Sequence, residues 1–361
     1  MDKSNIDPTN NLDSIETILS VDSTGMRERL ADFHLQCGSA WAKSNKNELP
    51  PEYSKFKQIA IVGMGGSAIS GNLVKDLFRY QSNIPISVIR SSILPTWVND
   101  ETLVIACSYS GNTKETLTIF DDAIRRGCRV ICSTSGGILQ EKSDSLNLPS
   151  LSIDFTGEPR SAIGYSFLNL VSILDRLGFI PSQHTYVTST IEQLKINSEN
   201  WNHKVPTKSN YAKQIATRIG YSLPIIIGYD IFESVARRWK TQFNENSKSI
   251  AIWEAMPEFL HNSVESFQPT TYSTFFPMVI LLEPQTVKQY QDNPFMDFVK
   301  YLQGIHVPYE LVKVEQINTM AQVLSIVQLG DYVSYYLALL KNIDPGPVGI
   351  IEILKSKKTN Y

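Results

Sequence analysis

The stretch IAIVGMGGSAISG, residues 59–71, joins a strand-like run to a glycine-rich turn and the start of a helix. The apolar letters IAIV lead into glycines and small residues, and the helix-like NLVKDLF follows. Glycines free the backbone N–H groups of such a turn, and the N-terminus of the following helix attracts negative charge. The stretch therefore predicts an anion-binding turn at the end of a buried strand.

Further short apolar runs follow along the chain. Up to residue 153 they are ISVIR, LVIACS, RVICST and LPSLSID, with helix-length amphipathic segments between them. Such runs, apolar on both faces, are typical of parallel strands buried in an α/β sheet. A second set, LPIIIG, KSIAIW, FFPMVILLEP and VPYELVKVE, precedes a long helical pattern, VLSIVQLGDYVSYYLALLKNI. The sequence predicts two tandem α/β units, each a parallel sheet flanked by helices, with the second unit much diverged.

The length of 361 residues also favours two domains, because single hydrophobic cores seldom grow beyond ~250–300 residues. In the first 50 residues, apolar side chains recur at three- and four-residue spacing in one helical stripe: Met26, Leu30, Phe33, Cys37 and Trp41. We expect a helical leader packed on the domains (1–50), a first domain (51–180), a helical linker (181–212), and a second domain with a helical tail (213–361).

The composition excludes several classes of protein. Hydrophobic residues make up 42% and charged residues 19%, and the net charge is −3 without a long basic block, so no nucleic acid partner is expected. No run approaches 18 apolar residues, and the polar N-terminus lacks the apolar core of a secretory signal. We expect no membrane span and a cytoplasmic location. The four cysteines are too few and irregular for a disulfide framework, and we expect structural thiols.

The opening stretch also satisfies GxGxxA, with Gly63, Gly65 and Ala68, and could bind a dinucleotide. A nicotinamide-binding unit should place an acidic residue at the end of its second strand, to hold the ribose hydroxyls. That strand instead ends VIRSS, although Arg90 could accept a 2′-phosphate. An NADP-dependent oxidoreductase therefore stays open as an alternative.

The next strand favours a smaller anion. LVIACSYSGNTKET ends in Ser108, Ser110 and Thr113, directly before an amphipathic helix, and a third hydroxyl-rich turn, CSTSGGIL, ends the fourth strand. One hydroxyl would be explained as a helix cap. A cluster of hydroxyls beside free amides can donate to a phosphate dianion from several directions without a metal. The loops together favour the compact phosphate of a sugar phosphate over a dinucleotide.

These loops resemble those of the sugar isomerase (SIS) domain. GMGGSAISG, SYSGNTKET and TSGG carry that likeness, and the whole chain resembles the bifunctional phosphoglucose/phosphomannose isomerases, which are built from two SIS domains of flavodoxin-like αβα architecture. The likeness extends through MRERLADF, GEPRSAIGY, FNENSK, WEAMPEFLHN and NIDPGPVGIIEILK. The resemblance implies a metal-independent, cofactor-free isomerase that interconverts glucose 6-phosphate, and mannose 6-phosphate as well, with fructose 6-phosphate.

The resemblance also implies a role for each matching residue. Gly65, Gly66 and Ser67 would line the sugar side of the pocket, and Ser108, Ser110 and Thr113 would hold the phosphate. Arg160 would stabilise negative charge, Glu245 would move the proton between C1 and C2, His261 would assist ring opening, and Lys355 would contribute to ring opening or substrate contact. In this family the histidine reaches the site from the neighbouring subunit, so the resemblance implies a homodimer with its active site at the subunit interface.

The chemistry of these residue types agrees with the implied roles. Aldose–ketose isomerisation needs a carboxylate near C2, an acid or base at the ring oxygen, and positive charge facing the enediolate. Taken singly, Glu245 is typical of a solvated helix, His261 of a structural histidine and Lys355 of a charged tail. The interpretation rests on their conjunction with the phosphate loops. A non-catalytic phosphosugar sensor would keep the loops without needing these residues, and is the main alternative.

The sequence departs from the family pattern at three places. The histidine lies in LHNS where the family has NHNE, with Glu265 two places late, so a contact that orients His261 is expected to differ. Gly346 stands where members often carry threonine, which leaves the preference between C2 epimers open. The second domain's loop GYDIFES lacks the glycine pair, so no second phosphosugar site is expected there.

Overall fold

The computed structural model describes residues 12–46, 48–268, 276–285, 293–313, 315 and 318–357. The chain divides into two compact units, each discontinuous in sequence. The first unit comprises Asp32–Lys195 and Gln316–Leu324, and the second comprises the described residues of Met1–Ala31, Ile196–Glu315 and Ser325–Tyr361. The domain boundaries expected from the sequence stay a prediction.

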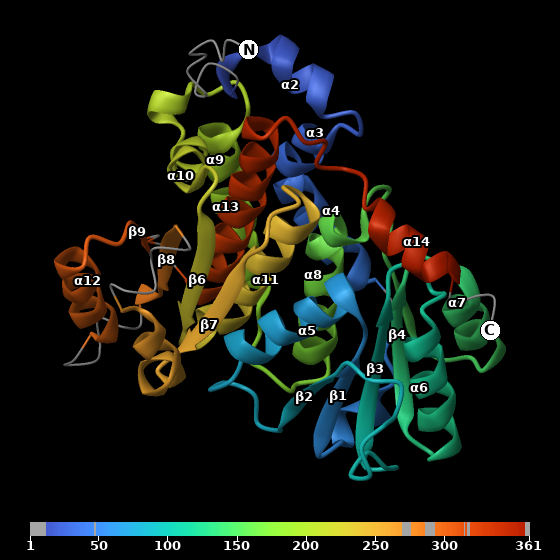
Figure 1. Ribbon diagram of the computed structural model, residues 1–361. Coiled ribbons are helices and arrows are strands. Elements are labelled where there is room, and N and C mark those ends of the chain that lie inside the picture. Colours follow the sequence, from blue (N-terminus) through green and yellow to red (C-terminus); the bar gives the residue numbers. More distant parts are fainter. Residues whose placement is uncertain are drawn as a thin grey trace. The chain divides into compact units, whose positions relative to one another are not determined.

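The first unit is built on a five-stranded sheet in which every strand is parallel, in the order β2-β1-β3-β4-β5 (Figure 1). The strands are β1 (Gln58–Val62), β2 (Ile86–Ile89), β3 (Thr102–Ser108), β4 (Arg129–Thr134) and β5 (Ser150–Ser152). Val62 lies beside Ala106, so β1 and β3 end side by side. The strand order changes direction between these two strands, and the loops that follow them meet at a topological switch point.

Helices cover both faces of this sheet. On one face, alternate residues of the strands pack with α6 (Lys114–Arg125) and α7 (Gly137–Ser145). On the other face lies α5 (Gly65–Leu77), which packs against α8 (Ile163–Arg176). Helix α4 (Phe33–Ser44) packs on α8 in turn. Burial of the strands on both faces of the sheet is the property that the short apolar runs predicted.

The second unit has a four-stranded parallel sheet in the order β7-β6-β8-β9 (Figure 1). Its strands are β6 (Leu223–Tyr229), β7 (Ile252–Met256), β8 (Pro277–Glu283) and β9 (Tyr309–Lys313). This is the order of the first four strands of the other sheet. Helices that lie wholly within the described part of this unit include α2 (Ile15–Val21), α3 (Met26–Ala31), α10 (Tyr211–Ile219), α11 (Glu233–Glu245), α12 (Pro294–Gly304) and α14 (Gly349–Lys357). The predicted class, α/β with parallel sheets flanked by helices, is confirmed.

Two long helices, α9 (His184–Trp201) and α13 (Thr319–Leu340), have residues in both units. Helix α13 is long and apolar enough to cross a membrane, but 94% of its most apolar window is buried within the fold. The tyrosines Tyr332, Tyr335 and Tyr336 are buried, and Tyr332 and Tyr336 stack. Helix α13 is therefore a core helix, and its tyrosines form a packed face.

The five apolar residues of the expected leader stripe are all buried. The helix is nevertheless interrupted at Asp32, where α3 gives way to α4, and the N–H of Gln36 donates to the Asp32 carbonyl. The periodicity continues across the break, so the pattern did not reveal it. Helix α4 belongs to the first unit, and α2 and α3 belong to the second.

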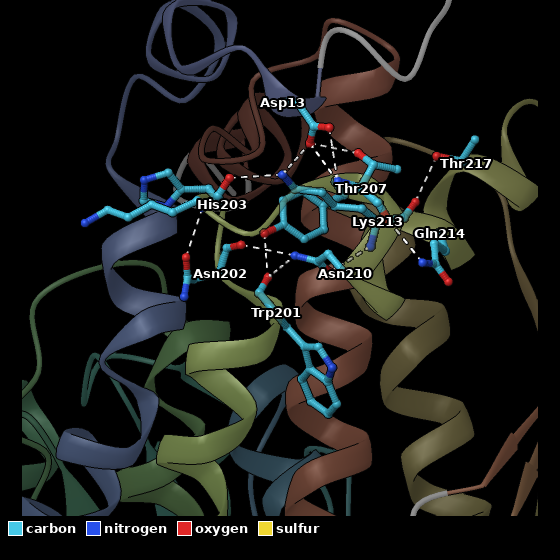
Figure 2. A network of polar contacts seen from close by, with 11 residues as sticks. Asp13, Trp201, Asn202, His203, Thr207, Asn210, Lys213, Gln214 and Thr217 are labelled. Atoms are coloured by element: carbon cyan, nitrogen blue, oxygen red, sulfur yellow. Dashed lines mark hydrogen bonds and ion pairs between the residues drawn. The ribbon is translucent and has the colours of Figure 1, made fainter.

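An ion pair between the exposed Asp13 and the buried Lys213 joins the segment before α2 to α10 (Figure 2). The Lys213 ammonium lies 2.9 Å from the Asp13 carboxylate and 3.0 Å from the carbonyl oxygen of His203. It also lies over the ring of Tyr336. The Thr207 N–H and hydroxyl donate to Asp13 from the other side. A fully buried lysine needs such partners, because an isolated ammonium is costly to remove from water.

Candidate active site

The first turn of α5, which begins shortly after β1, carries Gly65, Gly66 and Ser67. Gly65 has a φ of +51° and begins α5, whose N-cap residue, Met64, provides no side-chain hydrogen bond. A Cβ on Gly66 would lie 3.2 Å from the carbonyl oxygen of Pro159, so this glycine permits a close approach of another backbone segment. The turn thus presents a helix N-terminus without a side-chain cap, as an anion site requires.

The loop between β3 and α6 carries three hydroxyl groups. Ser108 is buried, and its Oγ lies 3.0 Å from Thr113 Oγ1, so the two hydroxyls share a hydrogen bond. Thr113 is the N-cap residue of α6, but its side chain does not cap the helix. Ser110 is exposed, and its Oγ accepts from the Asn112 N–H. The cluster is not explained by helix capping, and the start of α6 keeps N–H groups directed out of the helix.

The hydroxyl-rich turn between β4 and α7 braces the loop before α6. Thr134 Oγ1 donates to the carbonyl oxygen of Gly136, and Ser135 Oγ donates to that of Tyr109. The Ile138 N–H donates to Asn112 Oδ1, which ties the start of α7 to the same loop. The hydroxyls of Thr134 and Ser135 are therefore engaged with backbone carbonyls, and this turn acts as a support.

Arg160 is brought to the same edge of the first unit. It is only 4% exposed and lies in the 3₁₀ helix η2 (Pro159–Ala162), which packs against α5 and α8. The close approach of Gly66 joins this segment to the β1–α5 turn. The hydroxyl of Tyr109, in the β3–α6 loop, donates to the carbonyl oxygens of Phe155 and Gly157. These bonds join the chain that leads to Arg160 to the β3–α6 loop. Seven predicted site residues thus share one edge of one sheet.

Glu245 lies in the second unit, as the last residue of α11, and is half-buried. Helix α11 packs against β6 and β7. The residues after Glu245 are held firmly: Asn246 Nδ2 donates to Ser334 Oγ at 2.9 Å, and Ser247 Oγ donates to the carbonyl oxygen of Phe243 at the same distance. The Lys248 ammonium donates to the Glu245 carbonyl oxygen. The polar segment is a well-anchored helix end rather than a solvated run.

His261 and Lys355 are both exposed, His261 at the end of the 3₁₀ helix η5 (Glu258–His261) and Lys355 on α14. Within the described part of the second unit, neither side chain makes a hydrogen bond or an ion pair, so the structure does not join them to Glu245. The turn after His261 is held by carboxylates: Asn262 Nδ2 donates to Glu258 at 2.7 Å, and Ser263 Oγ donates to Glu254 at 3.0 Å. The bond of Ser263 depends on the serine that LHNS has in the place of the glutamate of NHNE.

Two residues of this region escaped the sequence analysis. Tyr109 stands between Ser108 and Ser110 inside the hydroxyl cluster. Burial raises the pKa of its phenol, which the bond to Gly157 partly offsets, so the hydroxyl stays protonated and donates. Gln36, a buried polar residue beside the leader stripe, bonds to Ser161 and to residue 164. The position of Gln36 directly beside the apolar stripe could have indicated that its amide is buried and needs hydrogen-bond partners.

No group of three or more His, Cys, Asp or Glu side chains suited to a metal ion occurs within the residues that the structure covers. The cysteines are buried and unpaired with one another. Burial raises the pKa of Cys107 and of Cys132 to about 12, so both stay protonated thiols at neutral pH. The prediction of structural thiols is confirmed.

Known proteins resemble this chain in sequence and fold. A family model described as the bacterial phospho-glucose isomerase C-terminal SIS domain matches residues 208–357. A bifunctional phosphoglucose/phosphomannose isomerase from Caldicellulosiruptor bescii is 36% identical over 83% of this chain and 89% of its own length. One from Aquifex aeolicus is 31% identical, over 86% of this chain and 93% of its own. In structure, a glucose-6-phosphate isomerase-like protein from Thermus thermophilus covers 96% of this chain and 98% of its own, with a TM-score of 0.62 and 20% identity, a likeness of fold alone.

Proposed function

We propose that this chain, which belongs to the family of bifunctional phosphoglucose/phosphomannose isomerases, interconverts glucose 6-phosphate and mannose 6-phosphate with fructose 6-phosphate. One observation carries the proposal most directly. Two adjacent helix N-termini, with hydroxyl groups at both, lie beside the buried Arg160 at the switch point of one sheet. Such an edge suits a small ligand with a phosphate at one end and developing negative charge at the other.

Phosphate capture is the part of the cycle assigned to the first unit. The hydroxyls of Ser108, Ser110 and Thr113 donate to the phosphate oxygens, together with N–H groups at the starts of α5 and α6. Ser67 lines the sugar side of the pocket. Gly65 and Gly66 leave room for the sugar. The Ser108 and Thr113 hydroxyl oxygens already lie 3.0 Å apart, so both are in place before the phosphate binds, and only the proton between them must turn toward the phosphate.

The chemical step is a proton transfer between neighbouring carbons. Glu245 removes the proton from C2 of the open-chain aldose; the released electrons form the C1–C2 double bond, and the electrons of the C1 carbonyl move onto its oxygen, which gives a cis-enediolate. The hydroxyl proton passes from O2 to O1, and the same carboxyl returns its proton to C1, so that C2–O2 becomes the ketose carbonyl and no atom is gained or lost. Arg160 stabilises the enediolate charge as it develops, and such stabilisation is commonly the largest catalytic contribution.

Ring opening is assigned to His261, with Lys355 as a second contact to the ring or the substrate. The exposed position of His261 suits a side chain that acts in the active site of a neighbouring subunit. The proposal therefore includes a homodimer, two tandem SIS domains in each chain, and a cytoplasmic location. The matched C-terminal SIS model and the shared strand order of the two sheets support the tandem arrangement.

A coupled assay tests the activity. Purified protein in EDTA is given fructose 6-phosphate, and the glucose 6-phosphate formed is followed through its dehydrogenase; mannose 6-phosphate is then supplied as substrate. Turnover with both substrates is the expected result. Turnover with fructose 6-phosphate alone would contradict the bifunctional part. No turnover in a protein that fructose 6-phosphate still stabilises against heat would favour the phosphosugar sensor instead.

A complementation assay tests the shared site. Glu245→Gln and His261→Asn variants are each expected to be nearly inactive. If His261 serves the partner's site, mixed dimers hold one site with both intact residues and one with neither, and random mixing restores about a quarter of wild-type sites. Unchanged low activity after subunit exchange, confirmed by mass spectrometry of differently tagged chains, would contradict a site composed from two subunits.

A further inference from the structure

We infer that Gln36 and Tyr109 are positioning residues that hold the segment around Arg160 from its two ends. The inference rests on the isomerase activity proposed above. Arg160 lies in the short 3₁₀ helix η2, and such short turns have few internal hydrogen bonds to fix them. The position of its guanidinium therefore depends on what holds the flanking backbone.

Tyr109 holds the segment before Arg160. Its hydroxyl oxygen lies 2.8 Å from the carbonyl oxygen of Phe155 and 3.2 Å from that of Gly157. One hydroxyl has a single proton, so the two carbonyls share it. This contact ties the chain that leads into η2 to the β3–α6 loop, where the phosphate is proposed to bind.

Gln36 holds the segment after Arg160, and it comes from α4, in the leader. Its Nε2 donates to the carbonyl oxygen of Ser161 at 2.9 Å, and its Oε1 accepts from the N–H of Gly164 at 2.6 Å. Helix α8 has no side-chain cap from its own N-cap residue, Ala162. Gln36 therefore satisfies a free N–H group of the first turn of α8 from a distant part of the chain.

The fit around Gln36 is close. A Cβ on Gly164 would lie 2.5 Å from Gln36 Oε1, so glycine at this position leaves room for the amide. Gln36 is only 8% exposed, so water does not readily replace it. Since Gln36 belongs to neither phosphate loop, its loss should act on the chemical step and leave phosphate capture unchanged.

The Gln36→Met variant tests the downstream contact, because methionine has a similar length without the amide. We expect kcat for fructose 6-phosphate to fall about ten- to a hundredfold, as small misplacements of a catalytic group do. The affinity for inorganic phosphate, measured by thermal shift, should stay within about twofold. The matched control is Tyr165→Phe, which removes the 2.8 Å bond between the hydroxyls of Tyr165 and Ser39. That bond also joins α4 to α8 but does not touch the Arg160 segment, so kcat should change by less than about twofold.

The Gln36→Glu variant adds a readout that loosened packing alone would not produce. A protonated carboxyl at this position can donate to Ser161 and accept from Gly164, and an ionised one cannot donate. Burial opposite a carbonyl raises the pKa of a carboxyl above its usual range. The ratio of variant to wild-type kcat should therefore approach one near about pH 6 and fall as the pH rises. The ratio for Gln36→Met should stay flat over the same range.

Tyr109→Phe should also lower kcat, and the double variant with Gln36→Met should lose less than the product of the two single losses, since both contacts hold one segment. A kcat of Gln36→Met within about twofold of an active wild type, or a loss confined to KM, would overturn the inference. A flat pH ratio for Gln36→Glu would do the same. An inactive wild type would overturn the proposed function itself, which separates the two failures.

Discussion

Gly111 and Gly136 pack backbone against backbone: a Cβ on Gly111 would lie 1.7 Å from the carbonyl oxygen of Gly136. The contact joins the β3–α6 loop to the β4–α7 turn, and it is reinforced by the hydrogen bond from the N–H of Leu139 to the Gly111 carbonyl oxygen at 3.0 Å. The two glycine-containing loops thus form one rigid support for the hydroxyls of Ser108 and Thr113.

Gly111→Ala should therefore disrupt this support. Gly111 has a φ of +68°, so alanine would be strained there even in open space, and the methyl group would also collide with backbone. We expect a loss of about 3 kcal/mol or more in the free energy of unfolding, measured in urea, together with loss of the thermal shift caused by inorganic phosphate. The matched control is Gly178→Ala, which has a φ of +73° but nothing within 4 Å of the added methyl group. It should cost only about 1–2 kcal/mol and leave the phosphate shift intact.

Glu245→Gln should remove the base while keeping the fold. The amide is isosteric, and the anchoring bonds of Asn246 and Ser247 do not involve the Glu245 side chain. We expect kcat for both sugar phosphates to fall by at least about a hundredfold, with the melting temperature unchanged and fructose 6-phosphate still bound. Glu233→Gln, at the other end of α11, is the control and should keep near wild-type turnover. Turnover of Glu245→Gln close to wild type would remove Glu245 from the mechanism.

Much of this fold could be predicted because its information is local. Each buried parallel strand must be apolar on both faces, and each connection must span a helix, so the strands appear as short runs at wide spacing. The residues proposed to bind phosphate could be predicted for the same reason, because the glycine-rich and hydroxyl-rich segments come directly after the apolar runs of β1 and β3. Their adjacency, seen in the pairing of Val62 with Ala106, is a consequence of the strand order.

The remainder depends on contacts between distant parts of the chain. That Gly66 faces Pro159, or that Gln36 reaches Ser161, is decided by how α4, α5 and α8 pack, which no local pattern encodes. The break at Asp32 is hidden for a related reason, because the apolar stripe keeps its spacing across it. The roles of Glu245 and His261 were inferred from the family resemblance, because no local pattern in the sequence relates either residue to a substrate. These roles remain proposals.

Arg238 and Asp331 form a buried ion pair, and its loss should destabilise the second unit. Two hydrogen bonds, of 2.7 and 3.0 Å, join one Arg238 nitrogen to both Asp331 oxygens, and the side chains are 1% and 8% exposed. Arg238→Ala would leave the carboxylate buried without this guanidinium, and we expect a loss of about 3–5 kcal/mol in unfolding free energy. Lys57→Ala is the control: its ion pair with Glu101 is exposed, so the change should cost less than about 1 kcal/mol. Equal effects of the two substitutions would contradict the assignment.

The Asp13–Lys213 pair provides a pH-dependent prediction (Figure 2). Burial lowers the pKa of Lys213, and the hydrogen bond that Lys213 donates to Asp13 partly offsets that effect. In Asp13→Ala the offset is lost, so the pKa of Lys213 should fall further below its ordinary value of about 10.4. Near neutral pH the variant must bury an ammonium without its carboxylate, and we expect it to be about 1–3 kcal/mol less stable than wild type.

That deficit should shrink as the pH rises. Between the lowered pKa and the ordinary one, folded Asp13→Ala releases the Lys213 proton while the unfolded chain keeps it, so its stability increases with pH. Urea unfolding near pH 7 and near pH 9.5 measures the change. Adding Lys213→Met to Asp13→Ala removes the buried charge, which should restore part of the lost stability and abolish its pH dependence, because an apolar replacement of both partners is often tolerated. A deficit that is the same at both pH values would show that Lys213 does not carry the cost.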